Sequence, residues 1–133
     1  MSRMGHLKDR GECGSAAVEF ALVLPLVLLM ALALVQVGLL VKDQIVVEEA
    51  ARAGARQAAV TTDDQETRDA VVAAAVSLDA EELDVSVDRE DGAGSAVTVT
   101  VVYHAAIDIP LVSWLFPNSV DISGVATMRQ EVG

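Results

Sequence analysis

One acidic side chain, Glu19, lies at the leading edge of the longest apolar run in the chain. The run from Phe20 to Val41 contains 22 residues, none of them charged, and Gln36 is its only strongly polar member. At about 1.5 Å per residue a helix of this length spans about 33 Å, which matches a hydrocarbon thickness of about 30 Å. The run therefore predicts a membrane-spanning helix, with a mild kink expected near Pro25.

A carboxylate at the hydrocarbon edge costs a few kcal/mol and usually has a specific partner. Glu19 could instead extend its side chain to the headgroup layer, since it lies near the end of the span. The residues alone leave both roles open. The charge bias around the span does not fix its orientation either, because three basic residues precede it and three follow it closely.

The residues around Glu19 form a recognisable pattern. A short leader with basic residues ends in Gly14, and the stretch GSAAVEF then places Glu19 fifth after that glycine, at the start of the apolar helix. This arrangement resembles the class III signal of type IV pilins and pseudopilins. The longer stretch, with its Ala-Val-Glu-Phe-Ala core and a proline soon after, resembles the TadE-like family of the tight-adherence (Flp pilus) system.

The resemblance implies that a prepilin peptidase cuts between Gly14 and Ser15. Residues 1–14 would then be a leader left on the cytoplasmic side, and the C-terminal domain would be extracytoplasmic. The new amine at Ser15 would be a cation at the membrane depth of Glu19, so the carboxylate of one subunit could pair with the amine of its neighbour. Ser15 is not the aromatic or methionine often found first in mature pilins, which leaves N-methylation open.

The sequence after the span predicts an α+β fold of the pilin type. We expect the helix to cover 15–41 in the membrane and 42–60 beyond it, followed by a small domain over 61–133. A second helix is expected from about 68 to 78, with Thr67 as its cap.

Small residues recur every fourth position along the helix extension: Ala50, Gly54 and Ala58. Such a stripe allows close packing, either on the sheet of this chain or on a neighbouring subunit. On another face Glu48 precedes Arg52 by four residues, a spacing that favours an ion pair.

Three segments near the C-terminus alternate apolar and polar residues. Leu83 to Asp88 and Val97 to His104 flank the turn sequence REDGAGS and predict a hairpin, and Val120 to Arg129 predicts a third strand. The connection IPLVSWLFPN holds Trp114 and Phe116, which we expect either to fill the core or to form an exposed contact patch.

Charge and composition exclude several functions. From Lys42 onward six basic residues face seventeen acidic ones, so a nucleic-acid surface is not expected. No metal-ligand spacing joins His6, His104 or the lone Cys13, and the DREDG sequence lacks the other ligands of a calcium loop. No catalytic grouping, cofactor motif or small-molecule site is apparent, so a non-enzyme is expected.

The resemblance to the TadE-like family implies a minor pseudopilin-like subunit or assembly factor of a tight-adherence pilus or related secretion apparatus. Its partners would be the prepilin peptidase, other pilin or pseudopilin subunits, pilus assembly proteins and membrane lipid. The alternative is a solitary membrane-anchored module whose acidic outer domain binds a ligand or an envelope protein.

Overall fold

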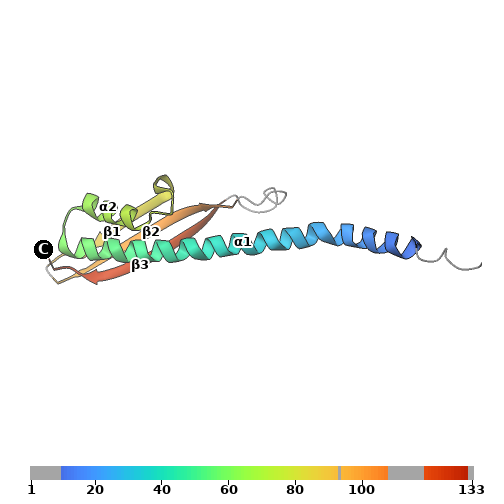
Figure 1. Cartoon of the computed structure of the whole chain (residues 1–133). Helices are drawn as coiled ribbons and strands as arrows, with labels where there is room; N and C mark the ends of the chain where they lie inside the picture. The colour runs from blue at the N-terminus through green and yellow to red at the C-terminus, as the bar shows by residue number, and fades with distance from the viewer. Residues whose placement is uncertain (1–9, 93, 108–118, 132–133) are drawn as a thin grey trace, which may run out of the picture. The chain divides into compact units, whose positions relative to one another are not determined.

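The computed structural model describes residues 10–92, 94–107 and 119–131, with side chains from Gly14 onward. The connection that carries Trp114 and Phe116 lies outside the described residues, as does most of the predicted leader. The elements follow the chain in the order of two α-helices, a short 3-10 helix and three strands (Figure 1). The predicted α+β fold class is confirmed.

The first helix, α1, runs without interruption from Arg10 to Val60 and continues through Pro25. Alanine, leucine and valine dominate it, and a proline within an apolar helix is tolerated where neighbouring groups satisfy the freed carbonyl. Residues 42–60 belong to the same helix as the apolar run. The helix starts before the expected cleavage position, inside the predicted leader.

The second helix, α2, covers Asp64–Ala74, so the predicted start near residue 68 and end near 78 are wrong. Its N-cap is Asp63, whose backbone is extended (φ −83, ψ 112) and whose carboxylate accepts a hydrogen bond from the backbone N–H of Gln65 at 2.8 Å. Thr67, the predicted cap, lies one turn inside the helix and is fully buried. Two consecutive aspartates made the earlier start possible, because the first caps and the second favours the positive helix end.

The strands β1 (Leu83–Arg89), β2 (Ala96–Ala106) and β3 (Ser119–Arg129) form an antiparallel sheet in the order β1-β2-β3, within the part of the chain described. The predicted hairpin and third strand are confirmed. The connection between β1 and β2 contains Gly92 and Gly94, whose φ angles of 108° and 87° favour glycine. The 3-10 helix η1 (Ala80–Glu82) leads into β1.

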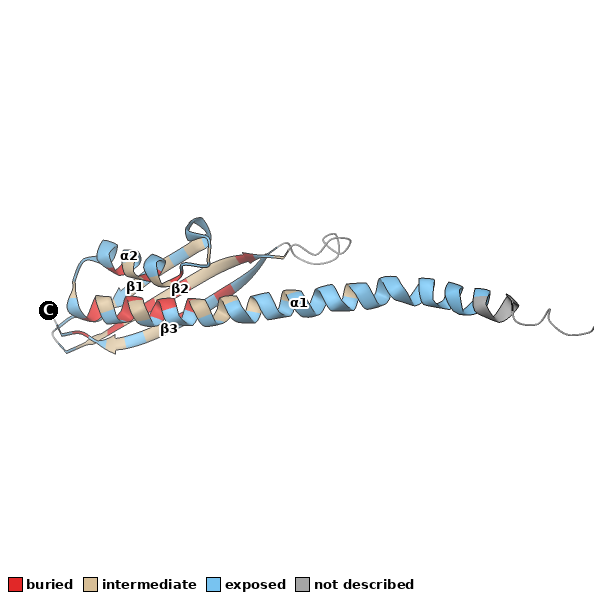
Figure 2. Ribbon diagram, in the orientation of Figure 1, coloured by how far each residue is buried: buried red, intermediate tan, exposed pale blue. Residues whose placement is uncertain are grey.

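The core lies between the inner face of the sheet, α2 and the C-terminal part of α1 (Figure 2). Valines from β2 meet alanines from α1, and the larger side chains of β1 are half-buried at the margin. The fully buried valines are Val47, Val71, Val97, Val99 and Val101. Small helix residues opposite branched strand residues let helix and sheet approach closely.

One side chain and one backbone N–H from outside α1 donate hydrogen bonds to carbonyl groups in its last turn. Arg89 of β1 donates from Nη1 to the carbonyl oxygen of Ala58 at 2.8 Å, and its Nη2 lies 3.1 Å from a carboxylate oxygen of Asp64. The backbone N–H of Glu131 donates to the carbonyl oxygen of Ala59 at 2.8 Å. These contacts satisfy carbonyls that a helix end leaves without intrahelical partners.

Contacts within the chain divide it into two units, Met1–Gln36 and Val37–Gly133. The first unit contains most of the apolar run, and the second contains the sheet, α2 and the last part of α1. Leu40, although within the apolar run, is half-buried against the core of the second unit.

Candidate assembly site

The residues of the predicted processing motif lie in the first turns of α1. Gly14, Ser15 and Glu19 are helical and exposed. A Cβ placed on Gly14 would meet nothing within 4 Å. The motif is therefore presented on an open helix surface.

Ser15 and Glu19 are four residues apart in one helix, so they lie on the same face, about one turn apart. Residues at this spacing have Cβ atoms about 5 to 6 Å from each other. Ser15 thus shares a helix face with the carboxylate of Glu19, and both residues are exposed.

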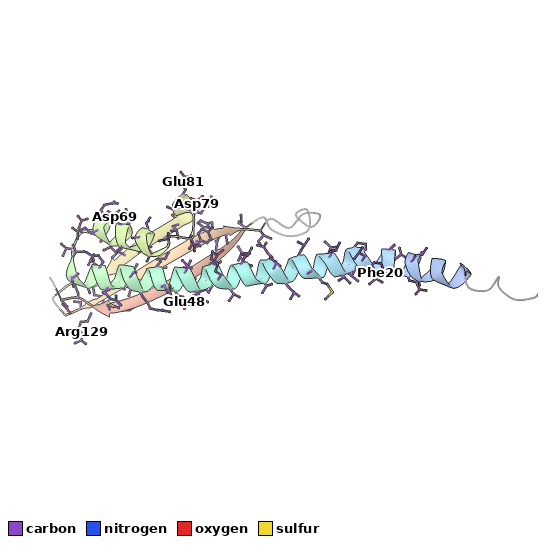
Figure 3. All side chains as sticks on the ribbon, in the orientation of Figure 1. Phe20, Glu48, Asp69, Asp79, Glu81 and Arg129 are labelled. Carbon is purple, nitrogen blue, oxygen red and sulfur yellow. The ribbon has the colours of Figure 1, made fainter. Side chains whose placement is uncertain are left out.

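The helix after Glu19 exposes large apolar side chains on all sides. From Val18 to Val41 the exposed residues include Phe20 at 66%, Leu22 at 74% and Leu34 at 72%. Figure 3 shows these side chains, with Phe20 labelled, projecting away from the ribbon. A continuous apolar surface of this size is not stable in water and requires lipid or other helices around it.

In the described part of the chain, α1 is the one helix long and apolar enough to cross a membrane. Its most apolar stretch has a mean hydropathy of 2.7, and none of that stretch is buried. A core helix of a soluble domain of this length would bury much of its apolar surface. The exposed run is consistent with a membrane span.

The small-residue stripe of Ala50, Gly54 and Ala58 is buried within this chain. A Cβ on Gly54 would lie 2.5 Å from Cγ2 of Val71 in α2 and 3.1 Å from Cγ1 of Val99 in β2. The stripe is therefore covered by this chain itself, by α2 together with the sheet.

The opposite face of the helix extension is exposed and charged. Arg52 Nη2 lies 3.1 Å from Glu48 Oε2, so the predicted ion pair is confirmed. Both side chains are about half exposed, which limits the contribution of the pair to about 0.5 kcal/mol.

A polar cluster that the sequence did not reveal lies on the outer face of the sheet. His104 Nδ1 is 2.7 Å from Asp121 Oδ1 on β3, and His104 Nε2 is 3.2 Å from Asp84 Oδ2 on β1. The hydrogen bonds to Asp121 and then Asp84 raise the pKa of His104 above its usual value, and this effect exceeds the opposing effect of desolvation. Strand alternation alone puts the three residues on one face, but only the register brings them together.

No group of three His, Cys, Asp or Glu side chains in the described residues is arranged to hold a metal ion. The His104 cluster contains two hydrogen-bonding contacts between side chains, to Asp121 and to Asp84.

The fold and the exposed span together define a class: a single-pass membrane protein with an N-terminal apolar helix and a small α+β domain. Residues 14–56 match the family model described as TadE-like protein, so the resemblance predicted from the sequence is confirmed over this segment. The match indicates a role in tight-adherence (Flp) pilus systems and in general a pilus-system partner. No curated protein and no solved structure matches the chain.

Proposed function

We propose that the chain is a minor pseudopilin-like subunit or assembly factor of a tight-adherence pilus or a related secretion apparatus. The main support is that the family match begins at Gly14 and runs through Glu19 and the whole apolar span. In this proposal the leader 1–14 is cytoplasmic, residues 15–41 cross the cytoplasmic membrane, 42–60 extend the helix, and the domain over 61–133 is extracytoplasmic.

A prepilin peptidase would cut between Gly14 and Ser15. The exposure of both residues and the open space around Gly14 support access by an enzyme. The cut removes Cys13 with the leader, so the mature chain contains no cysteine.

The freed amine of Ser15 would then pair with Glu19 of an adjacent subunit. In surroundings of low dielectric constant each charge stabilises the other, and removal of one partner strands the other at a cost of about 3 to 5 kcal/mol. Glu19 would therefore select neighbours that present an amine at the same depth. The chain acts by helix packing with other pilin or pseudopilin subunits, with no catalytic step of its own.

Intact-mass measurement of the full chain, produced in membranes with and without a prepilin peptidase, tests the cleavage. We expect a mature species that starts at Ser15 only when the peptidase is present. A chain that keeps Met1 in the presence of the active peptidase would contradict the proposal and favour a membrane-anchored binding module.

Assembly is tested separately with the substitutions Glu19→Ala and, as a matched control in the same span, Gln36→Ala. A cysteine introduced as Leu34→Cys, at a strongly exposed position, is combined with one cysteine introduced into the apolar helix of the pilin subunit. An added oxidant then joins the two thiols where the helices are close, and the mature chain offers no other cysteine. We expect Glu19→Ala to insert and be cleaved but to lose cross-linking to pilin subunits, while Gln36→Ala keeps it. Unchanged cross-linking in Glu19→Ala would show that the carboxylate only reaches the headgroups.

A further inference from the structure

The outer face of the sheet carries one side chain that contacts both neighbouring strands. His104 belongs to the central strand β2 and lies directly opposite Asp121 of β3 in the strand register. Asp84 of β1 is paired with Val102, so it is the diagonal neighbour of His104 on the same face. The imidazole therefore joins all three strands of the described sheet at one end.

The geometry identifies the protonation state that fits this contact. Both ring nitrogens of His104 face a carboxylate oxygen, at 2.7 Å and 3.2 Å. A neutral imidazole has one N–H and can donate to only one of them, whereas the imidazolium donates from both nitrogens. With a neutral ring, one unprotonated nitrogen would face an anionic oxygen, and that contact is repulsive.

The surroundings of the ring are acidic on every packed element. Asp84 approaches from β1 and Asp121 from β3. Asp79, the N-cap of η1, and Glu82, its last residue, line an open pocket of about 520 Å³ together with His104. No Lys or Arg lines this pocket among the residues that the structure describes. The local charge therefore favours the imidazolium.

The two ends of β1 are held by different chemistry. Arg89 holds one end, through Ala58 and Asp64. Guanidinium groups are not deprotonated in proteins. His104 holds the other end through Asp84, and its charge depends on pH near neutrality. The edge strand β1 pairs over seven residues, whereas β2 and β3 pair over eleven, so β1 is the strand that can separate at lower cost.

We propose that His104 is a pH-responsive clamp that holds the first residues of β1 and the preceding η1 segment against β2 when protonated, and releases them when neutral. When the ring loses one proton, the remaining N–H stays on Nδ1, which has the shorter contact, to Asp121. Nε2 then no longer donates a hydrogen bond to Asp84. Opening is local and begins at Leu83, while the end at Arg89 stays closed.

The direction of the pH effect follows from the hydrogen bonds to the ring. Because the pKa of His104 is raised in the folded chain, its stabilising contribution is complete below the ordinary imidazole value of about 6.5. The contribution is lost as the pH rises through the higher pKa of the folded state. Protection of β1 is therefore expected to decrease toward alkaline pH.

Hydrogen exchange of the full chain in detergent micelles or nanodiscs, corrected for the intrinsic pH dependence of exchange, tests the clamp. From pH 5.5 to 8.5 we expect the protection factors of the amides of Leu83 to Val85 to fall roughly two- to fivefold. This range corresponds to the free energy that an exposed ion pair contributes. The amides near Arg89 serve as an internal control and should not change. His104→Gln should give a flat profile in the same segment.

A second pair of variants separates the two carboxylates. Asp84→Asn should abolish the pH dependence of β1 protection while the imidazole NMR signal of His104 still titrates above its ordinary value, because Asp121 remains. Asp121→Asn should lower the titration midpoint further than Asp84→Asn does, since its hydrogen bond is the shorter. The proposal is overturned if protection of β1 has the same pH profile in His104→Gln as in the original chain. It is also overturned if the His104 imidazole of the original chain titrates at or below its ordinary value.

Discussion

Gly124 of β3 lies so close to α1 that a Cβ placed on it would be 2.9 Å from the carbonyl oxygen of Val47. The same Cβ would be 3.1 Å from backbone atoms of Glu48, and Gln44 of the same helix donates a hydrogen bond to the carbonyl oxygen of Ser123 at 3.1 Å. Strand and helix thus touch through their backbones at this point. A helix backbone cannot move aside as a flexible side chain can.

Substitution Gly124→Ala is expected to destabilise the domain by about 1 to 3 kcal/mol, because the added methyl group forces β3 and α1 apart. Urea unfolding of the full chain in detergent, followed by far-ultraviolet circular dichroism, measures this change. The adjacent Val125→Ala is the control, since Val125 is 63% exposed on the other face. Equal midpoints for the two variants would show that the contact is not tight.

Substitution Gly54→Ala is also expected to destabilise, although alanine is favoured over glycine in a helix by about 1 kcal/mol. Its Cβ would collide with Val71, whose branched side chain has little freedom to rotate, and would crowd Val99. The double variant Gly54→Ala with Val71→Ala should recover part of the loss in the same unfolding measurement. Additive losses in the double variant would argue against a direct clash.

Arg89→Ala is expected to cost about 1 to 3 kcal/mol, because the carbonyl oxygen of Ala58 loses a charged donor in a partly buried position. Arg52→Ala is the matched control: its ion pair has the same 3.1 Å separation, but its side chain is 58% exposed against 20% for Arg89. We expect Arg52→Ala to change the free energy of unfolding by less than about 0.5 kcal/mol. Similar losses in the two variants would mean that burial of Arg89 has no energetic effect.

Asp63→Ala is expected to destabilise α2 by about 1 kcal/mol through loss of the cap hydrogen bond to the Gln65 backbone. Asp63→Asn keeps an acceptor oxygen and should cost little, so the pair of variants isolates the cap. Hydrogen exchange in the first turn of α2 reports the effect locally. If hydrogen exchange becomes as fast in Asp63→Asn as in Asp63→Ala, the loss comes from the missing charge of Asp63 and not from the missing cap hydrogen bond.

Much of the fold could be predicted because its patterns are local. The uncharged run after Glu19 specifies a long helix, and the alternation from Val97 to His104 specifies a strand, each from consecutive residues. The start of α2 was harder to predict, because Asp63 and Thr67 are both residue types that cap helices. Asp63 is the N-cap in the structure, whereas Thr67 is buried in the core, and burial of this kind is not visible in the local sequence.

The candidate site was predictable only in part, for a physical reason. Gly14, Ser15 and Glu19 are close in sequence, so their arrangement follows from helix geometry. His104, Asp84 and Asp121 come from three strands, and a shift of the register by one residue would move each to the other face. Contacts of that kind require the folded sheet.

The charges on the two border strands of the described sheet affect how copies of the domain behave when they are crowded together. Strand β1 presents Asp84 and Asp88 along one border, and β3 presents Asp121 and Arg129 near the ends of the other. Charged residues on border strands discourage strand-to-strand fusion between molecules, because like charges would have to lose their water against each other. Domains held at high local concentration would therefore not pair through their border strands, and would not aggregate into amyloid-like sheets.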